Sequence, residues 1–218
     1  MTAFGWGMNG MEDKLERIAK SITGQFDEIT YVEIGVAEGV TLSAIAQLLK
    51  GNCKRWRAIG VELANGYSFN QQRTEEIMAR RYLDLEFVSP NGNVQRPRWN
   101  QVTVYFKDSQ SFLTELWQEP IHFALIDGCH GKPCVILDFI ALEAWMVDGG
   151  IILMHDIGED QIGLHQPHCT GGINVRGACY DLGLLANKRP GWKFTEEIKA
   201  DKSNGGWDMG VFEKCQTG

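Results

Sequence analysis

The chain alternates between short apolar runs and segments whose apolar residues recur every three or four positions. The first segment of the second kind covers about residues 11–23 and predicts an amphipathic helix. Further helical patterns follow at 42–49, at 112–117, from Pro133 to about Val147, and near 174–188. Between them lie apolar runs that predict strands, at Ile29–Ile34, Ala58–Leu63, Val102–Phe106, Ile121–Ile126 and Ile151–Met154. Strands that alternate with helices predict an α/β fold around a parallel sheet.

The end of the chain departs from this alternation. Trp192–Ile198 and Met209–Lys214 flank the turn sequence DKSNGG and predict an antiparallel hairpin. We therefore expect a single domain over residues 1–218, with a doubly wound, mostly parallel seven-stranded sheet of the Rossmann-like kind. Residues 64–100 are too long for a simple connection and predict an inserted helix followed by a loop. Residues 157–172 predict a mobile loop over the functional edge of the sheet.

The predicted helix at 134–147 is apolar on almost every face. Such a helix is expected to be deeply buried or to pack against a partner chain. A homodimer is therefore a candidate assembly.

Composition excludes several classes of function. The 218 residues carry a net charge of −7 without a basic cluster, so nucleic acid is not an expected partner. The sequence contains neither an apolar stretch long enough to span a membrane nor the pattern of a secretory signal at its start. Six cysteines are too few for a disulfide scaffold in a chain of this length. These features predict a cytoplasmic globular protein with reduced thiols.

Every parallel strand that is predicted ends at or beside a carboxylate. In parallel α/β sheets, ligands bind beyond the carboxyl ends of the strands, near the point where the strand order reverses. These ends are therefore the candidate site. The five acidic residues are Glu33, Glu62, Asp108, Asp127 and Asp156.

The turn after the first strand, EIGVAEG at 33–39, has glycines at positions 35 and 39 that let a ligand approach the backbone. A dinucleotide fingerprint needs glycine at positions 37 and 40, where this chain has Ala37 and Val40. The acid at position 33 also disfavours a phosphate. The turn therefore favours a cationic nucleoside without phosphate, although a tight structural turn would have the same pattern.

The ends of the second and third strands offer groups for the rest of a nucleoside. Glu62 can accept two hydrogen bonds from the vicinal hydroxyls of a ribose. Asp108 can accept a hydrogen bond from an adenine amino group, and Ser109 can instead cap the next helix. The two roles are compatible.

These motifs resemble the class I S-adenosylmethionine-dependent methyltransferases. The matching pieces are EIGVAEG, the acid in GVEL (60–63), KDS (107–109), LIDGCH (125–130) and GGIILMHD (149–156), in that order. Within the family the chain is most similar to small O-methyltransferases, including metal-assisted ones. The resemblance implies S-adenosylmethionine as cofactor and a small-molecule hydroxyl acceptor. It also implies a cofactor site lined by Glu33, Gly35, Ala37, Gly39, Glu62, Asp108, Ser109 and Asp127.

Asp127 and Asp156 end neighbouring strands in the predicted sheet, and two such oxygen ligands suit Mg²⁺ or a similar divalent cation. In the metal-assisted relatives, acids at these positions bind the ion, and the residue three beyond the first acid is the base. Here that residue is His130, whose ordinary pKa suits a base at neutral pH. Those relatives have a further amide or acid ligand after the second acid, where this chain has Ile157. Either Glu159 or Asp160 substitutes for that ligand, or no metal is bound.

Two alternatives remain at this stage. The first is a soft-metal site of thiols and imidazoles, although paired Cys-x-x-Cys spacing is absent. Its members would be Cys129, His130, Cys134, His155, His165, His168 and Cys169. The second keeps the fold with another function, either a metal-dependent hydroxylase or hydrolase, or a cofactor-binding protein without catalysis.

Overall fold

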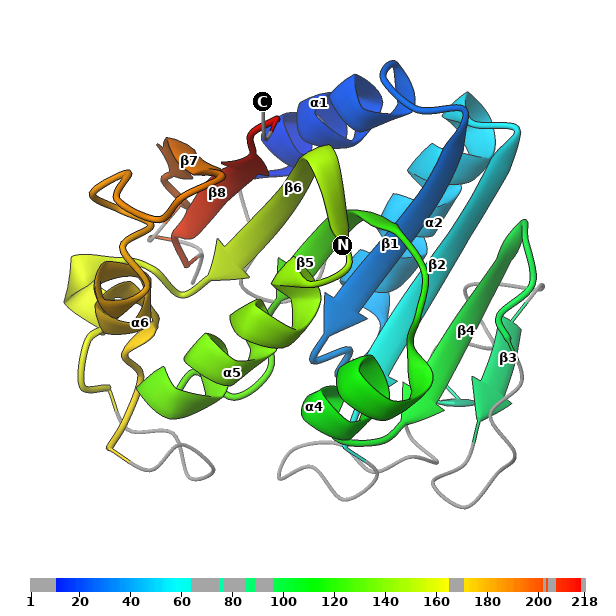
Figure 1. Cartoon of the computed structure of the whole chain (residues 1–218). Helices are drawn as coiled ribbons and strands as arrows, with labels where there is room; N and C mark the ends of the chain where they lie inside the picture. The colour runs from blue at the N-terminus through cyan, green and yellow to red at the C-terminus, as the bar shows by residue number, and fades with distance from the viewer. Residues whose placement is uncertain are drawn as a thin grey trace.

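The structure is a computed structural model that describes residues 11–63, 75–76, 85–88, 96–164, 171–201, 203 and 207–216. Within these residues, eight strands form one sheet in the order β3-β4-β2-β1-β5-β6-β8-β7 (Figure 1). The strands are β1 (Glu28–Ile34), β2 (Arg55–Glu62), β3 (Leu85–Val88), β4 (Gln101–Phe106), β5 (Ile121–Ile126), β6 (Met146–His155), β7 (Trp192–Ile198) and β8 (Met209–Lys214).

The sheet is parallel from β3 to β6, and β8 pairs antiparallel with both β6 and β7. The predicted mostly parallel sheet and its C-terminal hairpin are confirmed. The sheet has eight strands rather than seven because β3 adds to its edge beside β4. This strand has only four residues and lies in the 64–100 segment, where a helix and a loop were predicted. Glu75 and Glu76 are helical, and the remainder of that predicted helix lies outside the described residues.

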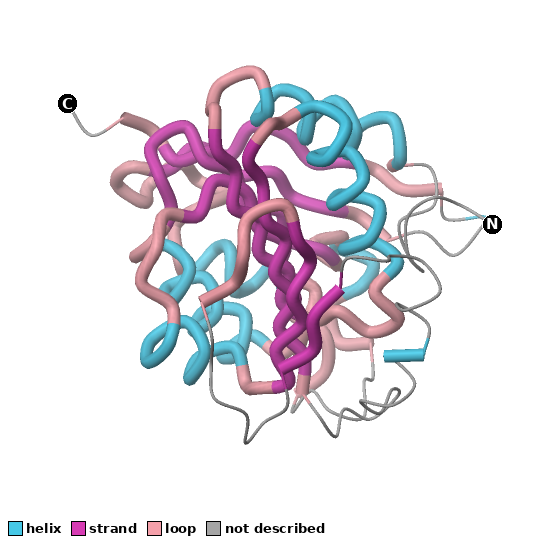
Figure 2. The backbone as a smooth tube through the Cα atoms, turned by 90° about the vertical axis from the view of Figure 1, so that its right-hand side faces the viewer, coloured by secondary structure: helices cyan, strands magenta, loops and turns pink. Residues whose placement is uncertain are grey.

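Helices cover both faces of the sheet, as Figure 2 shows from the side. One face packs against α1 (Glu12–Thr23) and α2 (Val40–Asn52). The other packs against the π-helical turn η1 (Phe112–Leu116), α5 (Lys132–Glu143) and α6 (Val175–Asp181). The single turn α4 (Ser109–Ser111) directly precedes η1. Successive strand residues contribute to opposite faces, so that Tyr31 joins the first layer of core and Val32 the second. A sheet buried on both faces explains why its strands are continuously apolar.

Two helices are shorter than predicted. Helix α5 ends at Glu143, and β6 begins at Met146, so the GG pair at 149–150 lies within the strand. Helix α5 is not buried all round, since Leu137 and Ile140 are each 47% exposed. Helix α6 ends at Asp181, where the sequence pattern extended to 188.

The register of the parallel strands brings their carboxyl ends to one edge, at the arrowheads in the lower part of Figure 1. Ile34 is paired with Val61 on one side and with Ile126 on the other, and Ile126 is paired with Met154. The acids that follow these strands therefore share one edge.

None of the helices in the described part of the chain has the length and apolar character needed to cross a membrane.

Candidate active site

The turn after β1 crosses very close to the end of β5. Gly35 has φ +85°, and a Cβ placed on it would lie 2.2 Å from the carbonyl oxygen of Asp127. The Gly35 N–H donates to the carbonyl oxygen of Val61 at 2.9 Å, and the Asp127 N–H donates to Ile34 at 2.8 Å. Only glycine fits this crossing, because a side chain would collide with backbone. The turn and Asp127 therefore form one rigid unit.

The rest of the turn has unusual backbone geometry. Ala37 adopts φ 47°, a left-handed conformation that costs a non-glycine residue roughly 1–2 kcal/mol. Gly39 also has a positive φ and forms the N-terminal boundary of α2. Strain of this kind persists where the surrounding structure enforces it, and it occurs most often at ligand sites.

Glu62 enforces this turn from the end of β2. Its Oε2 accepts hydrogen bonds from the N–H groups of Val36 and Ala37, both at 2.8 Å, and its Oε1 accepts one from Leu63 at 2.8 Å. Burial raises the pKa of Glu62 in spite of these three donors. The carboxylate thus lies against the glycine turn, beside the space where a ligand would pass.

Glu33 is buried below the same turn, 1% exposed, and accepts a 2.6 Å hydrogen bond from the Tyr31 hydroxyl. Burial raises the pKa of Glu33 well above its ordinary value, and the neighbouring carboxylates of Asp127 and Glu62 raise it further. The three acids lie around one turn, since Glu62 accepts hydrogen bonds from its N–H groups and the backbone of Asp127 lies against Gly35.

A second cluster joins the ends of β5 and β6. The ligand atoms of Asp127, His130, His155 and Asp156 all lie within 4.8 Å of one another. Asp127 Oδ1 lies 3.2 Å from His130 Nε2 and 3.0 Å from His155 Nδ1. Asp156 contacts the same two rings, His130 Nδ1 at 3.1 Å and His155 Nδ1 at 2.9 Å.

His155 and Asp156 are adjacent, and consecutive strand residues normally point to opposite faces. Both reach this cluster because β6 ends at His155 and Asp156 takes φ 62°, which turns the chain. From the sequence, His155 was predicted only as a member of the soft-metal set. The only sign of its role in the sequence was that His155 directly precedes Asp156 at the end of a predicted strand.

The cluster balances two carboxylates against two imidazoles, and all of these side chains except the partly exposed Asp127 are buried. Burial would raise the pKa of Asp127, but His155 and His130 outweigh it and hold that pKa below its ordinary value. Burial would conversely lower the pKa of both histidines, and the facing carboxylates raise the pKa of each instead, most strongly for His155. The arrangement can hold a proton or a cation between the acids.

A family model described as "Methyltransferase domain" matches residues 32–157, more than half of the chain and the part that contains both clusters. The chain belongs to this methyltransferase family. No curated protein matches the sequence.

Solved structures share the fold of this methyltransferase at low sequence identity. The O-methyltransferase from Bacillus cereus in complex with SAH has a TM-score of 0.62 and 16% identity, covering 94% of this chain and 80% of that one. TomG from Streptomyces achromogenes, an O-methyltransferase in complex with SAM, has a TM-score of 0.61 and 15% identity over 94% and 80%. A putative caffeoyl-CoA O-methyltransferase from Staphylococcus aureus has a TM-score of 0.63 and 13% identity over 94% and 82%. The predicted class I methyltransferase fold is confirmed.

The third strand end of the methyltransferase differs from one expectation. Asp108, not Ser109, caps the following helix, since its carboxylate accepts a 2.9 Å hydrogen bond from the Ser111 N–H. The Ser109 hydroxyl instead donates to Asp138 on α5 at 2.5 Å. Both residues lie at the expected edge of the sheet, but the Ser109 hydroxyl is hydrogen-bonded to α5 and does not cap the helix.

Asp138 gives the methyltransferase a pH-dependent stability. The Asp138 carboxyl is 2% exposed, and burial raises its pKa to about 6 although the hydrogen bond from Ser109 acts to lower it. Because the pKa of Asp138 is higher in the folded than in the unfolded state, the free energy of unfolding of the wild type falls relative to that of Asp138→Asn as the pH rises from about 4 to about 6. Above about pH 6 the difference between the two proteins is constant. We expect the variant to gain up to about 3 kcal/mol relative to wild type between pH 3.5 and 7.5, measured by urea unfolding. The exposed Asp148→Asn is the control, and a pH-independent difference for Asp138→Asn would contradict the assignment.

Cys129 and Cys134, the other soft-metal candidates that the structure describes, do not join the cluster of Asp127, His130, His155 and Asp156. Among the described residues, that group contains no cysteine. His165, His168 and Cys169 lie outside the described residues, as does most of the predicted loop tip. Glu159 and Asp160, offered as substitute ligands, are not members of the group.

Proposed function

We propose that the protein transfers the methyl group of S-adenosylmethionine to a hydroxyl group of a small molecule, with the help of a divalent cation. The observation that carries this proposal is the contact between the two clusters. The glycine turn touches the backbone of Asp127, whose side chain belongs to the acid and imidazole group. A ligand lying along the turn would thus end beside groups able to deprotonate a hydroxyl.

The turn after β1 and Glu62 are proposed to hold the nucleoside. Glu62 would offer its carboxylate to the ribose hydroxyls while it keeps the N–H groups of Val36 and Ala37 in place. Asp127, whose pKa is held below its ordinary value, places a carboxylate at the end of this turn, which favours a sulfonium over a phosphate. S-adenosylmethionine supplies a sulfonium-bound methyl group, which passes to the acceptor oxygen as S-adenosylhomocysteine leaves.

His130 is proposed as the base that takes the hydroxyl proton. Its two ring nitrogens face Asp127 and Asp156, so one of these contacts has to open when the acids take up the cation and the ring receives the proton. The carboxylate that stays in contact would fix the ring orientation and stabilise the imidazolium that forms. Positioned bases of this kind contribute roughly 10²–10⁴-fold to rate.

Asp127, His155 and Asp156 are the proposed cation ligands, and their donor chemistry fits. His155 would supply a third ligand in place of the amide or acid that the relatives have after the second acid, where this chain has Ile157. A bound cation would lower the pKa of a hydroxyl coordinated to it. An imidazole among carboxylates suits Mn²⁺, Fe²⁺, Co²⁺ or Zn²⁺ better than Mg²⁺, which prefers oxygen ligands. We therefore expect these ions to bind more tightly than Mg²⁺.

Titration with S-adenosylhomocysteine tests the proposal. Glu62→Gln should weaken its binding about tenfold or more, since charge-assisted hydrogen bonds are worth roughly 1.5–3 kcal/mol. Calorimetry measures both affinity and stoichiometry. The matched control is Glu28→Gln, because Glu28 begins β1 at the opposite edge and pairs with Arg55. Affinity unchanged within about twofold for Glu62→Gln would remove the ribose assignment.

A second candidate is an iron-dependent hydroxylase on the same fold. The observation that favours it is the pair of imidazoles beside carboxylates, a donor set that non-haem Fe(II) oxygenases also use. Oxygen consumption that requires iron and is independent of S-adenosylmethionine would support this candidate over methyl transfer.

A further inference from the structure

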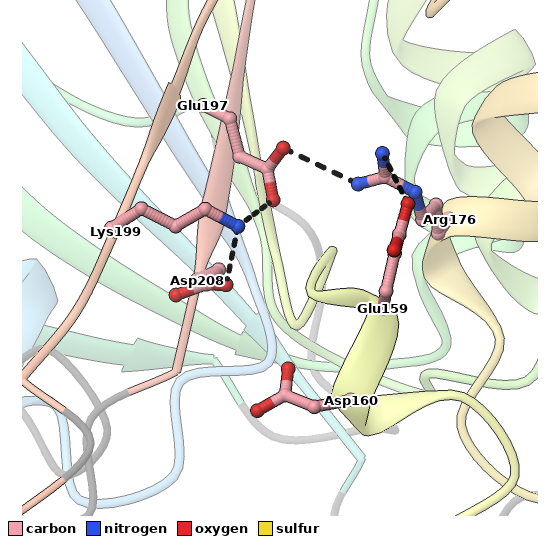
Figure 3. A pocket seen from close by; sticks show the side chains of 6 residues that line it. All are labelled: Glu159, Asp160, Arg176, Glu197, Lys199 and Asp208. Atoms are coloured by element: carbon pink, nitrogen blue, oxygen red, sulfur yellow. Dashed lines mark hydrogen bonds and ion pairs between the residues drawn. The ribbon is translucent and has the colours of Figure 1, made fainter.

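A charged hollow of about 450 Å³ is lined by side chains from four segments of the chain (Figure 3). Its lining comes from η2 (Glu159–Gln161), from α6, from the end of β7 and from the residue before β8. All six lining side chains are charged, and they are Glu159, Asp160, Arg176, Glu197, Lys199 and Asp208.

The hollow continues the functional edge of the sheet. Met209 of β8 is paired with His155 of β6 and with Ile198 of β7, so Asp208 and Lys199 lie just beyond the row in which His155 ends β6. The strand order therefore places the proposed nucleoside site at β1 and β2, the acid and imidazole cluster at β5 and β6, and the hollow at β6 to β7. An acceptor reaching the cluster from the side away from the cofactor would meet this hollow.

Backbone contacts connect the hollow to the cluster. The N–H of Ile157, the residue after Asp156, donates to the carbonyl oxygen of Asp208 at 3.1 Å. Arg176 donates to the carbonyl oxygen of Ile157 at 3.3 Å. The hollow and the proposed reaction centre are thus fixed relative to each other.

The charges in the hollow favour a cation. Four carboxylates face two basic groups, and each basic group is already shared: Arg176 between Glu159 and Glu197, and Lys199 between Glu197 and Asp208. The lining thus has two negative charges in excess. Added positive charge is attracted in such a site, and added negative charge is repelled.

Two of these carboxylates come close together beside Gly158. A Cβ on Gly158 would lie 2.6 Å from Asp160 Oδ1 and 2.9 Å from Asp208 Oδ2, so these two oxygens are at most 5.5 Å apart. Asp208 is 2% exposed, and its Oδ1 accepts a hydrogen bond from the Ala200 N–H. An ammonium has three donors and can contact two oxygens at this separation.

We infer that this hollow binds a positively charged group of the acceptor, such as a protonated amine, while the acceptor hydroxyl lies at the acid and imidazole cluster. This inference rests on the proposed function, because it assigns the acceptor's charge to that same site. It predicts that the protein selects aminated hydroxyl compounds over neutral or acidic ones of equal shape.

Three catechols that share one vicinal diol and differ in charge test this selection: dopamine, 4-methylcatechol and 3,4-dihydroxyphenylacetate. Binding to the full-length, Mn²⁺-loaded protein is measured by calorimetry in the presence of S-adenosylhomocysteine. We expect the cationic catechol to bind about tenfold or more tightly than the neutral one, and the anionic one most weakly. The preference should decrease as salt is added.

Two variants connect the preference to the hollow. Asp160→Asn removes one carboxylate, and Gly158→Ala adds a methyl group that forces Asp160 and Asp208 to move apart. Each should reduce the preference for the cation about tenfold while affinity for the neutral catechol is retained, and the exposed Glu115→Gln should change neither.

Equal affinities, preference for the anion, or no binding of dopamine at about 10 mM would overturn the inference. It would equally be overturned if the variants lowered thermal stability with the charge preference intact, since the network would then be only a structural link. Binding of S-adenosylhomocysteine is measured in the same samples and tests the proposed function separately.

Discussion

Replacing Asp127 with asparagine should reduce methyl transfer by about 10²–10⁴-fold, the range associated with losing a positioned proton-transfer system. The Asp127 carboxylate contacts both His130 and His155 and is a proposed cation ligand. Asparagine retains the shape but removes the charge that orients His130 and offsets the cation. Initial rates with an excess of S-adenosylmethionine measure this loss.

The same variant should bind Mn²⁺ about 10–100-fold more weakly, measured by calorimetry without cofactor. Asp181→Asn is the control, because Asp181 is half-exposed and pairs only with the surface residue Lys132 among its described ion pairs. If Asp127→Asn retained at least half of the wild-type rate, the role assigned to Asp127 would be contradicted. Full activity of the wild type after exhaustive chelation would contradict the role of the cation.

Gly35→Ala should cost more than about 3 kcal/mol of folding stability and abolish S-adenosylhomocysteine binding. The added Cβ would lie 2.2 Å from the oxygen, 2.5 Å from the carbonyl carbon of Asp127 and 2.6 Å from the Cα of Gly128. These are backbone atoms of a buried strand end, so relief requires the turn or β5 to move, and overpacking of this kind is among the most destabilising changes. Urea unfolding measures the cost.

Two other glycines separate the causes of that effect. Gly163 has φ +80° with nothing within 4 Å of its Cβ position, so Gly163→Ala reports conformational strain alone, about 1–2 kcal/mol. Gly51 lies in α2 with open space around it, and Gly51→Ala should be neutral or stabilise by up to about 1 kcal/mol. If Gly35→Ala costs no more than Gly163→Ala, the close approach to Asp127 is not a real constraint.

The sequence predicted the architecture because the strands that form the centre of the sheet are continuously apolar and their helices have clear periodicity. Periodicity failed where local pattern is weak. Strand β3 has three half-buried residues and one buried residue in a segment of mixed charge, and only pairing with β4 makes it a strand.

The site was predicted to the extent that it follows from strand ends. Asp127, His130 and Asp156 were expected at one place and lie together. His155 was not assigned to that group, because strict alternation along β6 directs it away from Asp156, and only the left-handed φ of Asp156 brings both together. The bond between Ser109 and Asp138 spans 29 residues between two helices and has no signature in the sequence.

The central claim is that S-adenosylmethionine lies along the sheet edge, with its adenosine toward β1 and β2 and its methyl group toward the acids and imidazoles that follow β5 and β6. Proton NMR of S-adenosylmethionine with the Mn²⁺-loaded protein tests it directly, since paramagnetic broadening decreases steeply with distance from the ion. The account predicts that the methyl resonance broadens far more than the adenine H2 and H8 resonances. Equal broadening of all three, or stronger broadening of the adenine protons, would contradict it.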